Sequence, residues 1–209
     1  TKYAPDAIYL IDSNPVDILT YTFNKFSDIP ENRIIGSGTI LDTARLRERI
    51  AAYYRLNQSN VHAYVFGEHG DSAFIPWSAA NISNVPISDC QKLIAVPGAE
   101  ETALDLSEIE TDVKTSGGRI IARKGATFYA VSASVCHICN CILNRIDTTM
   151  PISTMMHGEY GIDDVCLSVL NIVGSGGIRS KVNLKLTDEE IAKLRHSADT
   201  LKEVIRNIN

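Results

Sequence analysis

The first forty residues alternate an apolar run, a helix-like segment and a second apolar run, and this order restricts the fold more than any other feature. Residues 7–11 (AIYLI) are continuously apolar, which is typical of a parallel strand buried on both faces. Residues 13–15 (SNP) end this run, and their Ser or Asn can cap a helix over about residues 16–26. Residues 33–36 (RIIG) predict a second strand. The segment therefore predicts a right-handed βαβ unit of an open parallel sheet, in which ligands bind beyond the carboxyl ends of the strands.

The rest of the sequence predicts helices followed by an antiparallel meander. Apolar spacing and cap residues predict helices over residues 42–56, 100–124 and 127–146, and from the capping box at 187–190 onward. Strands are expected over residues 61–66, 151–157, 165–173 and 178–184. Glycine-rich turns separate the last three strands, which favours a meander. Residues 74–78 can begin a further helix, and residues 81–86 are expected to form a loop.

A histidine between two glycines, His69, follows the apolar run at 61–66. Glycines let the backbone turn sharply and let a ligand approach, and histidine exchanges protons near neutrality. Asp42 and Arg45 are three residues apart, so they share one face of the preceding helix. One interpretation is a solvated ion pair worth a few tenths of a kcal/mol. In the other, Asp42 holds the imidazole of His69 and favours its charged form, while Arg45 grips a substrate carboxylate with two parallel hydrogen bonds. Such a trio could bind and protonate an oxo acid.

Three segments, in this order and spacing, resemble motifs of bacterial L-lactate dehydrogenases. Residues 13–17 (SNPVD) resemble a turn of that family, residues 41–47 (LDTARLR) resemble its Asp-x-x-Arg helix, and residues 67–72 (GEHGDS) resemble its active-site segment. The resemblance runs from Thr1 to the C-terminal end. It implies NAD-dependent interconversion of pyruvate and L-lactate by a cytoplasmic oxidoreductase.

The resemblance also implies roles for individual residues. His69, Asp42 and Arg45 would be catalytic, with His69 giving or taking the proton and Arg45 anchoring the carboxylate of pyruvate. Substrate would be bound by Asn14, Asp42, Arg45 and Thr127. The nicotinamide part of NAD would be contacted by Ser13, Asn14, Ser37 and Val131.

Two of these residues also have plainer structural interpretations. Thr127 stands where a helix N-cap is expected, which is the interpretation that the residues alone favour. Ser37 lies in a Gly-Ser-Gly turn that could be mistaken for a phosphate-binding loop. This turn is not a Gly-x-Gly-x-x-Gly, because Leu41 occupies the third glycine position.

Arg47 and His62 form a second candidate site. In bacterial relatives the matching positions bind the phosphates of fructose 1,6-bisphosphate, an activator, across a subunit interface. The resemblance therefore implies an allosteric homotetramer. The alternative is a solvated surface arginine, like Arg49 and Arg55, and an ordinary strand histidine.

The implied fold class is α/β, with the last strands of a parallel Rossmann-type sheet in residues 1–36 followed by an α+β substrate domain in residues 37–209. The domain contains the meander and the long helices. Only thirteen residues precede Asn14, so the family's glycine-rich phosphate turn, its ribose-binding acid and its mobile loop have no counterpart here. The chain resembles roughly the last two-thirds of the family.

Composition restricts the partners. A net charge of −5 argues against non-specific binding to nucleic acid or to an anionic membrane. No apolar run reaches membrane-spanning length, and no signal peptide opens the chain. Five cysteines, an odd number, favour reduced thiols in a cytosol. Residues 136–141 (CHICNC) do not have the spacing of a structural zinc site, so no metal is expected.

Two competing functions remain open at this point. A malate dehydrogenase uses the same Asp, Arg and His, although residues 124–127 (KGAT) and 14–17 (NPVD) look more similar to lactate dehydrogenases. A catalytically incomplete fragment could act only as a binding or assembly module. In that case the strand at 7–11 would expose an unpaired edge that invites pairing or aggregation.

Overall fold

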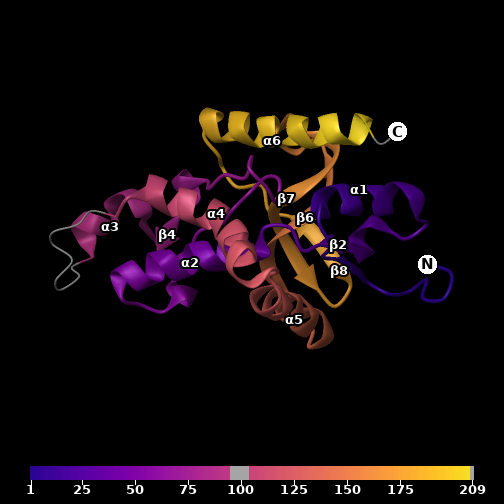
Figure 1. Ribbon diagram of the computed structural model, residues 1–209, viewed down its shortest axis with the longest axis horizontal. Helices are drawn as coiled ribbons and strands as arrows, with labels where there is room; N and C mark the ends of the chain where they lie inside the picture. Colours follow the sequence, from indigo (N-terminus) through magenta and orange to yellow (C-terminus); the bar gives the residue numbers. More distant parts are fainter. Residues whose placement is uncertain (95–103, 208–209) are drawn as a thin grey trace.

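A five-stranded mixed sheet lies at the centre of the molecule, as the computed structural model, which describes residues 1–94 and 104–207, shows (Figure 1). Its order is β1-β2-β6-β7-β8. The strands are β1 (Tyr9–Ile11), β2 (Ile34–Gly36), β6 (Thr148–His157), β7 (Asp163–Gly174) and β8 (Gly177–Lys181). β1 and β2 are parallel, and the other pairs are antiparallel. The predicted α/β class and the antiparallel meander are confirmed.

The predicted βαβ unit is present, with helix α1 (Val16–Phe26) between β1 and β2. β1 is half-buried, so the expected burial on both faces is wrong. The reason is that β1 is the edge strand of this sheet and has β2 as its neighbour on one side only. The predicted cap is also wrong, because Pro15 occupies the N-cap position of α1 and no side-chain hydrogen bond caps it.

Helix α2 (Ile40–Tyr54) packs beside a small antiparallel sheet of β3 (Val61–His62), β4 (Asn81–Ile82) and β5 (Val85–Pro86). The strand predicted over residues 61–66 is therefore too long. The loop predicted over residues 81–86 is instead a hairpin, whose turn residues Ser83 and Asn84 have positive φ. No α-helix begins at 74–78, where proline precedes a short 3-10 turn, Trp77–Ala79. Strands of two residues carry too little periodic signal to be read from sequence.

The remaining helices are α3 (Ile87–Leu93), α4 (Leu106–Lys124), α5 (Tyr129–Leu143) and α6 (Asp188–Arg206), and further 3-10 turns lie at Glu31–Arg33, Gln58–Asn60 and Glu159–Gly161. α4 begins later than predicted, with Asp105 as its cap, and residues 100–103 lie outside the described residues. α5 begins after Phe128, so Thr127 is not its N-cap. The predicted capping box of α6 is confirmed, since Thr187 and Glu190 exchange side-chain to backbone hydrogen bonds.

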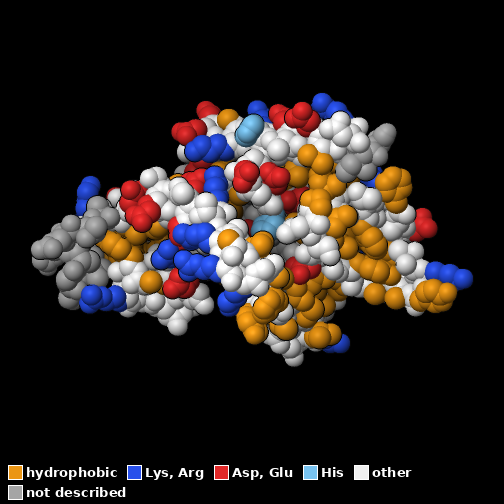
Figure 2. All heavy atoms as spheres, viewed as in Figure 1, with side chains coloured by type: hydrophobic (Ala, Val, Ile, Leu, Met, Phe, Trp, Pro, Cys, Tyr) orange, Lys and Arg blue, Asp and Glu red, His pale blue; other side chains and the backbone are white. Residues whose placement is uncertain are grey.

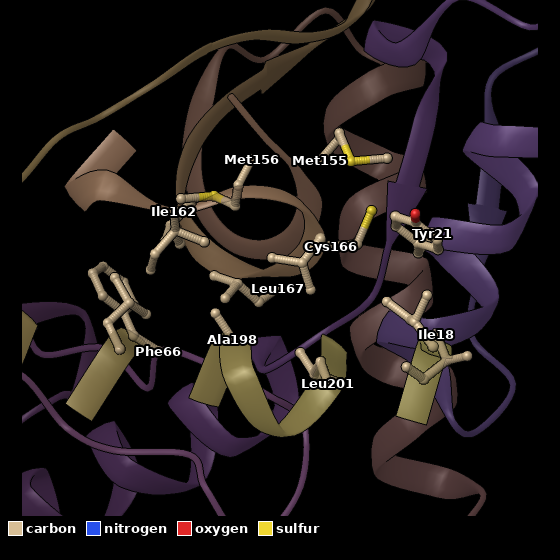
Figure 3. Close-up of a cluster of buried hydrophobic side chains, with 14 of the residues drawn as sticks. Ile18, Tyr21, Phe66, Met155, Met156, Ile162, Cys166, Leu167, Ala198 and Leu201 are labelled. Atoms are coloured by element: carbon tan, nitrogen blue, oxygen red, sulfur yellow. The ribbon is translucent and has the colours of Figure 1, made fainter. Parts of the chain in front are cut away.

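Helices cover both faces of the main sheet (Figure 1). On one face, α6 and α1 pack against β6 and β7, and Figure 3 shows the side chains of this cluster, including Ile18, Met156, Leu167 and Leu201. On the other face, α5 contributes Ile138. A third cluster joins α2 to the small sheet, α3 and α4. No helix within residues 1–94 and 104–207 is long and apolar enough to cross a membrane.

Candidate active site

A tight loop between Phe66 and Phe74 carries His69. The two phenylalanines exchange backbone hydrogen bonds of 2.9 and 3.0 Å, which close the loop at its base. Gly67 has φ +93°, a conformation that L side chains rarely adopt, and it exchanges two backbone hydrogen bonds of 2.9 Å with Ser168 of β7. The loop is therefore fixed to the central sheet just before it reaches His69.

The N-terminal turn of α2 is fixed to the segment between β3 and this loop. The Thr39 hydroxyl donates to the carbonyl of Val65, and the Val65 N–H donates to the Thr43 hydroxyl at 2.9 Å. These buried hydrogen bonds set the distance between α2 and the histidine loop. They place Asp42 and Arg45, one turn into the helix, beside the loop.

Asp42 contacts both His69 and Arg45, the two partners predicted from the sequence. Its Oδ2 lies 2.7 Å from Nδ1 of His69, and its Oδ1 accepts a hydrogen bond of 2.9 Å from Nη1 of Arg45. The intrahelical ion pair and the contact with the imidazole thus coexist. The hydrogen bond to Asp42 raises the pKa of His69, and burial opposes it. Nδ1 is occupied, so Nε2 is the ring nitrogen that remains for a ligand.

A cleft of about 260 Å³ opens beside His69. It brings together seven residues that the sequence singled out: Asn14, Ser37, Asp42, Arg45, His69, Thr127 and Val131. Asn14 and Ser37 follow the carboxyl ends of β1 and β2, where ligands of parallel sheets bind. Ser13 does not line this cleft and instead lines an apolar groove beside α1.

Helix α4 forms another wall of the cleft, which sequence reasoning missed. It contributes Val113, Lys114 and Ile121, together with two glycines at 117 and 118. A Cβ at either glycine would meet nothing within 4 Å, so the wall is open at that point. Amphipathic spacing identified the helix but did not indicate which surface it faces.

Arg47 and His62 lie outside the cleft. Arg47 is not solvated as expected: its Nε donates to the carbonyl of Ala63 at 3.0 Å, and its guanidinium carbon lies 4.8 Å from the centre of the Tyr64 ring. Burial lowers the pKa of this arginine. His62, next to Ala63, is exposed.

Arg49 is exposed, as expected, and it also forms an ion pair with Asp112 of α4. Arg55 at the end of α2 is exposed, as expected. Figure 2 shows the cations gathered over α2 and α4, next to the central hollow.

Asp17, on α1, is a site residue to which sequence reasoning gave no role. Its Oδ2 accepts a hydrogen bond of 2.7 Å from the backbone N–H of His69. The side chain is buried, and burial raises its pKa to about 6. Asp17 belongs to the SNPVD segment, but a contact across 52 residues leaves no periodic signal.

Two family models together match almost the whole chain. A model of the lactate/malate dehydrogenase α/β C-terminal domain matches residues 39–209, and a model of the NAD-binding domain of the same family matches residues 1–36. The L-lactate dehydrogenase of Acetivibrio thermocellus is 42% identical over 212 residues, covering 100% of this chain. L-lactate dehydrogenase 1 of Peribacillus psychrosaccharolyticus is 44% identical over 200 residues, covering 96% of this chain.

Solved structures show the same likeness in three dimensions. The minor L-lactate dehydrogenase of Enterococcus mundtii superposes with a TM-score of 0.89 at 36% identity, over 98% of this chain and 64% of that one. A lactate dehydrogenase from a deep-sea metagenome library gives a TM-score of 0.87 at 39% identity, over 94% of this chain and 62% of that one. The chain spans 65% and 62% of the two sequence relatives. The chain belongs to the lactate/malate dehydrogenase family.

Proposed function

We propose that this chain carries the substrate site of an NAD-dependent L-lactate dehydrogenase that interconverts pyruvate and L-lactate. The observation that carries the proposal is the contact of one carboxylate, Asp42, with both His69 and Arg45 at the edge of a small cleft. Such a trio pairs a proton donor with a carboxylate-binding cation. Family membership and the L-lactate dehydrogenase relatives support the same reaction.

In this mechanism Arg45 binds the carboxylate of pyruvate through charge-assisted hydrogen bonds. Asn14 hydrogen-bonds the same substrate, and Thr127 lies beside it. His69, protonated and held by Asp42 through Nδ1, donates the proton on Nε2 to the carbonyl oxygen. In the reverse direction neutral His69 accepts the proton of the lactate hydroxyl. Bound NADH supplies the hydride, and NAD⁺ accepts it in reverse.

The cleft fits the nicotinamide end of NAD. Polar Asn14 and Ser37 and apolar Val131 line it, which suits a ring that carries a carboxamide. Its volume of about 260 Å³ suits a small acid and one ring rather than a whole dinucleotide. We assign these three residues to the nicotinamide. Ser13 is the weakest assignment to the cofactor, because it lines the other groove.

The test is NADH oxidation by the chain with pyruvate and, separately, with oxaloacetate. We expect turnover that prefers pyruvate. A preference for oxaloacetate would assign a malate dehydrogenase. Absence of turnover with both substrates would contradict the proposal and favour a binding or assembly module.

We further propose that Arg47 and His62 bind the phosphates of fructose 1,6-bisphosphate and that this ligand activates the enzyme. The support is that Arg47 bonds to Ala63, the residue after His62, so the two side chains come from adjacent segments. Fructose 1,6-bisphosphate should lower the KM for pyruvate in the parent chain. Arg47→Gln and His62→Gln should abolish the effect, and Arg206→Gln, at an exposed arginine of α6, should not. A parent that does not respond at several pH values would contradict this proposal.

We propose in addition a homo-oligomer, in the form of a tetramer, in which copies of the chain cover the outer face of α5. Figure 2 shows a hydrophobic patch over this helix. The exposed side chains on it and beside it are Phe128, Tyr129, Leu143 and Ile146. Apolar patches of this kind mark interaction surfaces.

Sedimentation velocity tests the assembly. We expect the mass of four chains for the parent and a smaller species for Leu143→Glu. Leu93→Glu, at an exposed leucine of α3, is the control and should not change the mass. A monomeric parent at micromolar concentration would contradict the proposal.

Two further assignments complete the proposal. Residues 1–36 would be the end of the NAD-binding domain and residues 37–209 the substrate domain, a division that the limits of the two family matches support. We place the enzyme in the cytoplasm, where its five free thiols would stay reduced.

A further inference from the structure

A buried carboxylate of α1, Asp17, holds the main chain of the histidine loop. Its Oδ2 accepts a hydrogen bond of 2.7 Å from the N–H of His69 itself. Asp17 is 3% exposed and stands in the first turn of α1. The contact therefore ties the helix of the βαβ unit to the histidine of this loop, which lines the cleft.

His69 is held by two carboxylates from different helices. Asp42 of α2 bonds the ring at Nδ1, and Asp17 of α1 bonds the peptide nitrogen. With both groups held, the side chain has little freedom to move, and Nε2 stays directed by two separate elements. The charged groups that act on this imidazole are Asp42 and Arg45 from α2 and Asp17 from α1, so Asp17 adds a second negative charge to the surroundings of an imidazolium.

A contribution to the stability of the fold does not explain why a carboxylate is buried at position 17. Hydrogen bonding by the Ser153 hydroxyl and the His69 N–H lowers the pKa of this carboxyl group, but burial has the larger effect and raises the pKa to about 6. A carboxylate whose charge is opposed by burial destabilises a fold, and such groups concentrate at functional sites.

We propose that Asp17 is a positioning residue for His69, which it holds by the backbone while its charge favours the imidazolium. This inference rests on the proposed dehydrogenase function. Asp17 acts through His69 and not on the substrate.

Nuclear magnetic resonance of the 209-residue chain tests the proposal without any need for turnover. Asp17→Asn keeps an acceptor oxygen but removes the charge, so it should lower the pKa of His69 and leave exchange of the His69 amide slow. Asp17→Ala removes both, so it should lower the pKa and also speed amide exchange. Asp28→Asn, at an exposed carboxylate just after α1, should change neither.

A pKa of His69 that is unchanged in Asp17→Asn would overturn the proposal, and this variant decides the matter even where Asp17→Ala fails to fold. In an active enzyme, kcat/KM for pyruvate should fall about tenfold or more in Asp17→Ala, mainly through kcat, because Arg45 is untouched. If the parent does not turn over, the proposed function fails, while the resonance experiment still tests Asp17. If the parent turns over and the pKa of His69 is the same in both variants as in the parent, this inference alone fails.

Discussion

Both contacts of Asp42 were predicted from the sequence, but only as alternatives. The three-residue spacing to Arg45 predicted the ion pair, and the other interpretation of the same residues predicted the contact with His69. The structure has both, one to each carboxylate oxygen. Sequence reasoning treated the two as alternatives because spacing along a helix does not show which oxygen faces which partner. Asp17 and α4 were missed for a related reason, since their contacts with the site join segments far apart in the chain.

Asp42→Asn should lower the pKa of His69, because the hydrogen bond to the carboxylate is the largest cause that raises it. A raised pKa stabilises the fold fully below the ordinary value of 6.5, and this contribution is lost as the pH rises through the folded-state pKa. The variant should therefore be more destabilised at pH 6 than at pH 9, and its activity profile should move to lower pH. Urea denaturation at the two pH values checks this, and equal losses at both would contradict it.

Asp17→Asn should have the opposite pattern of stability. The folded pKa of Asp17, about 6, exceeds its ordinary value of 3.8, so its contribution to stability is complete below 3.8 and is lost as the pH rises through 6. The asparagine has no charge to bury. The variant should match the parent near pH 4 and exceed it at pH 7.5 by up to about 3 kcal/mol. Urea denaturation measures the difference in the free energy of unfolding between variant and parent. A difference that stays constant from pH 4 to pH 7.5 would contradict a raised pKa of Asp17 in the folded state.

Among the elements, those with strong local signals were predicted best. α2 and α6 have helical apolar spacing, and α6 also begins with the capping box of Thr187 and Glu190, as expected. The small sheet was missed because its strands are two residues long. The start of α5 was misplaced because Thr127, a good cap by type, is not used as one. Tertiary packing decides in such cases, and a local rule cannot anticipate it.

Helix α6 should stabilise the histidine loop through Ser197, which no local pattern predicted. The Ser197 hydroxyl accepts a hydrogen bond of 2.7 Å from the N–H of Glu68. It also lies 3.0 Å from the hydroxyl of Ser72. Ser197→Ala would leave the partly buried N–H of Glu68 without this acceptor, so it should cost about 1 kcal/mol in the free energy of unfolding.

A variant of the same helix provides the control for Ser197. Thr200→Ala removes a hydroxyl that only bonds its own helix, at the carbonyl of His196, and should change stability by less than about 0.5 kcal/mol. Equal effects of the two substitutions on urea denaturation would mean that Ser197 acts only within α6.

At the scale of the whole molecule, the site lies where three units meet. The βαβ unit supplies Asn14, Ser37 and Asp17, α2 supplies Asp42 and Arg45, and α4 and α5 close the far side. The βαβ unit also has an open edge at β1 and exposed apolar side chains on α1, namely Leu19 and Phe26. Figure 2 shows a hydrophobic surface over this region as well as over α5. The arrangement forms the cleft and leaves exposed apolar faces, which are typical of surfaces that other protein segments cover.

The central claim is that Arg45 and His69 together bind and protonate an oxo acid. The most direct test is pyruvate saturation of NADH oxidation by Arg45→Lys, with Arg206→Lys, at an exposed arginine of α6, as the control. An ammonium cannot reproduce the paired hydrogen bonds of a guanidinium, each worth about 1.5–3 kcal/mol to a charged group. We expect kcat/KM for pyruvate to fall by about 10²- to 10⁴-fold in Arg45→Lys and to stay unchanged in the control. Unchanged pyruvate kinetics in Arg45→Lys would contradict the claim.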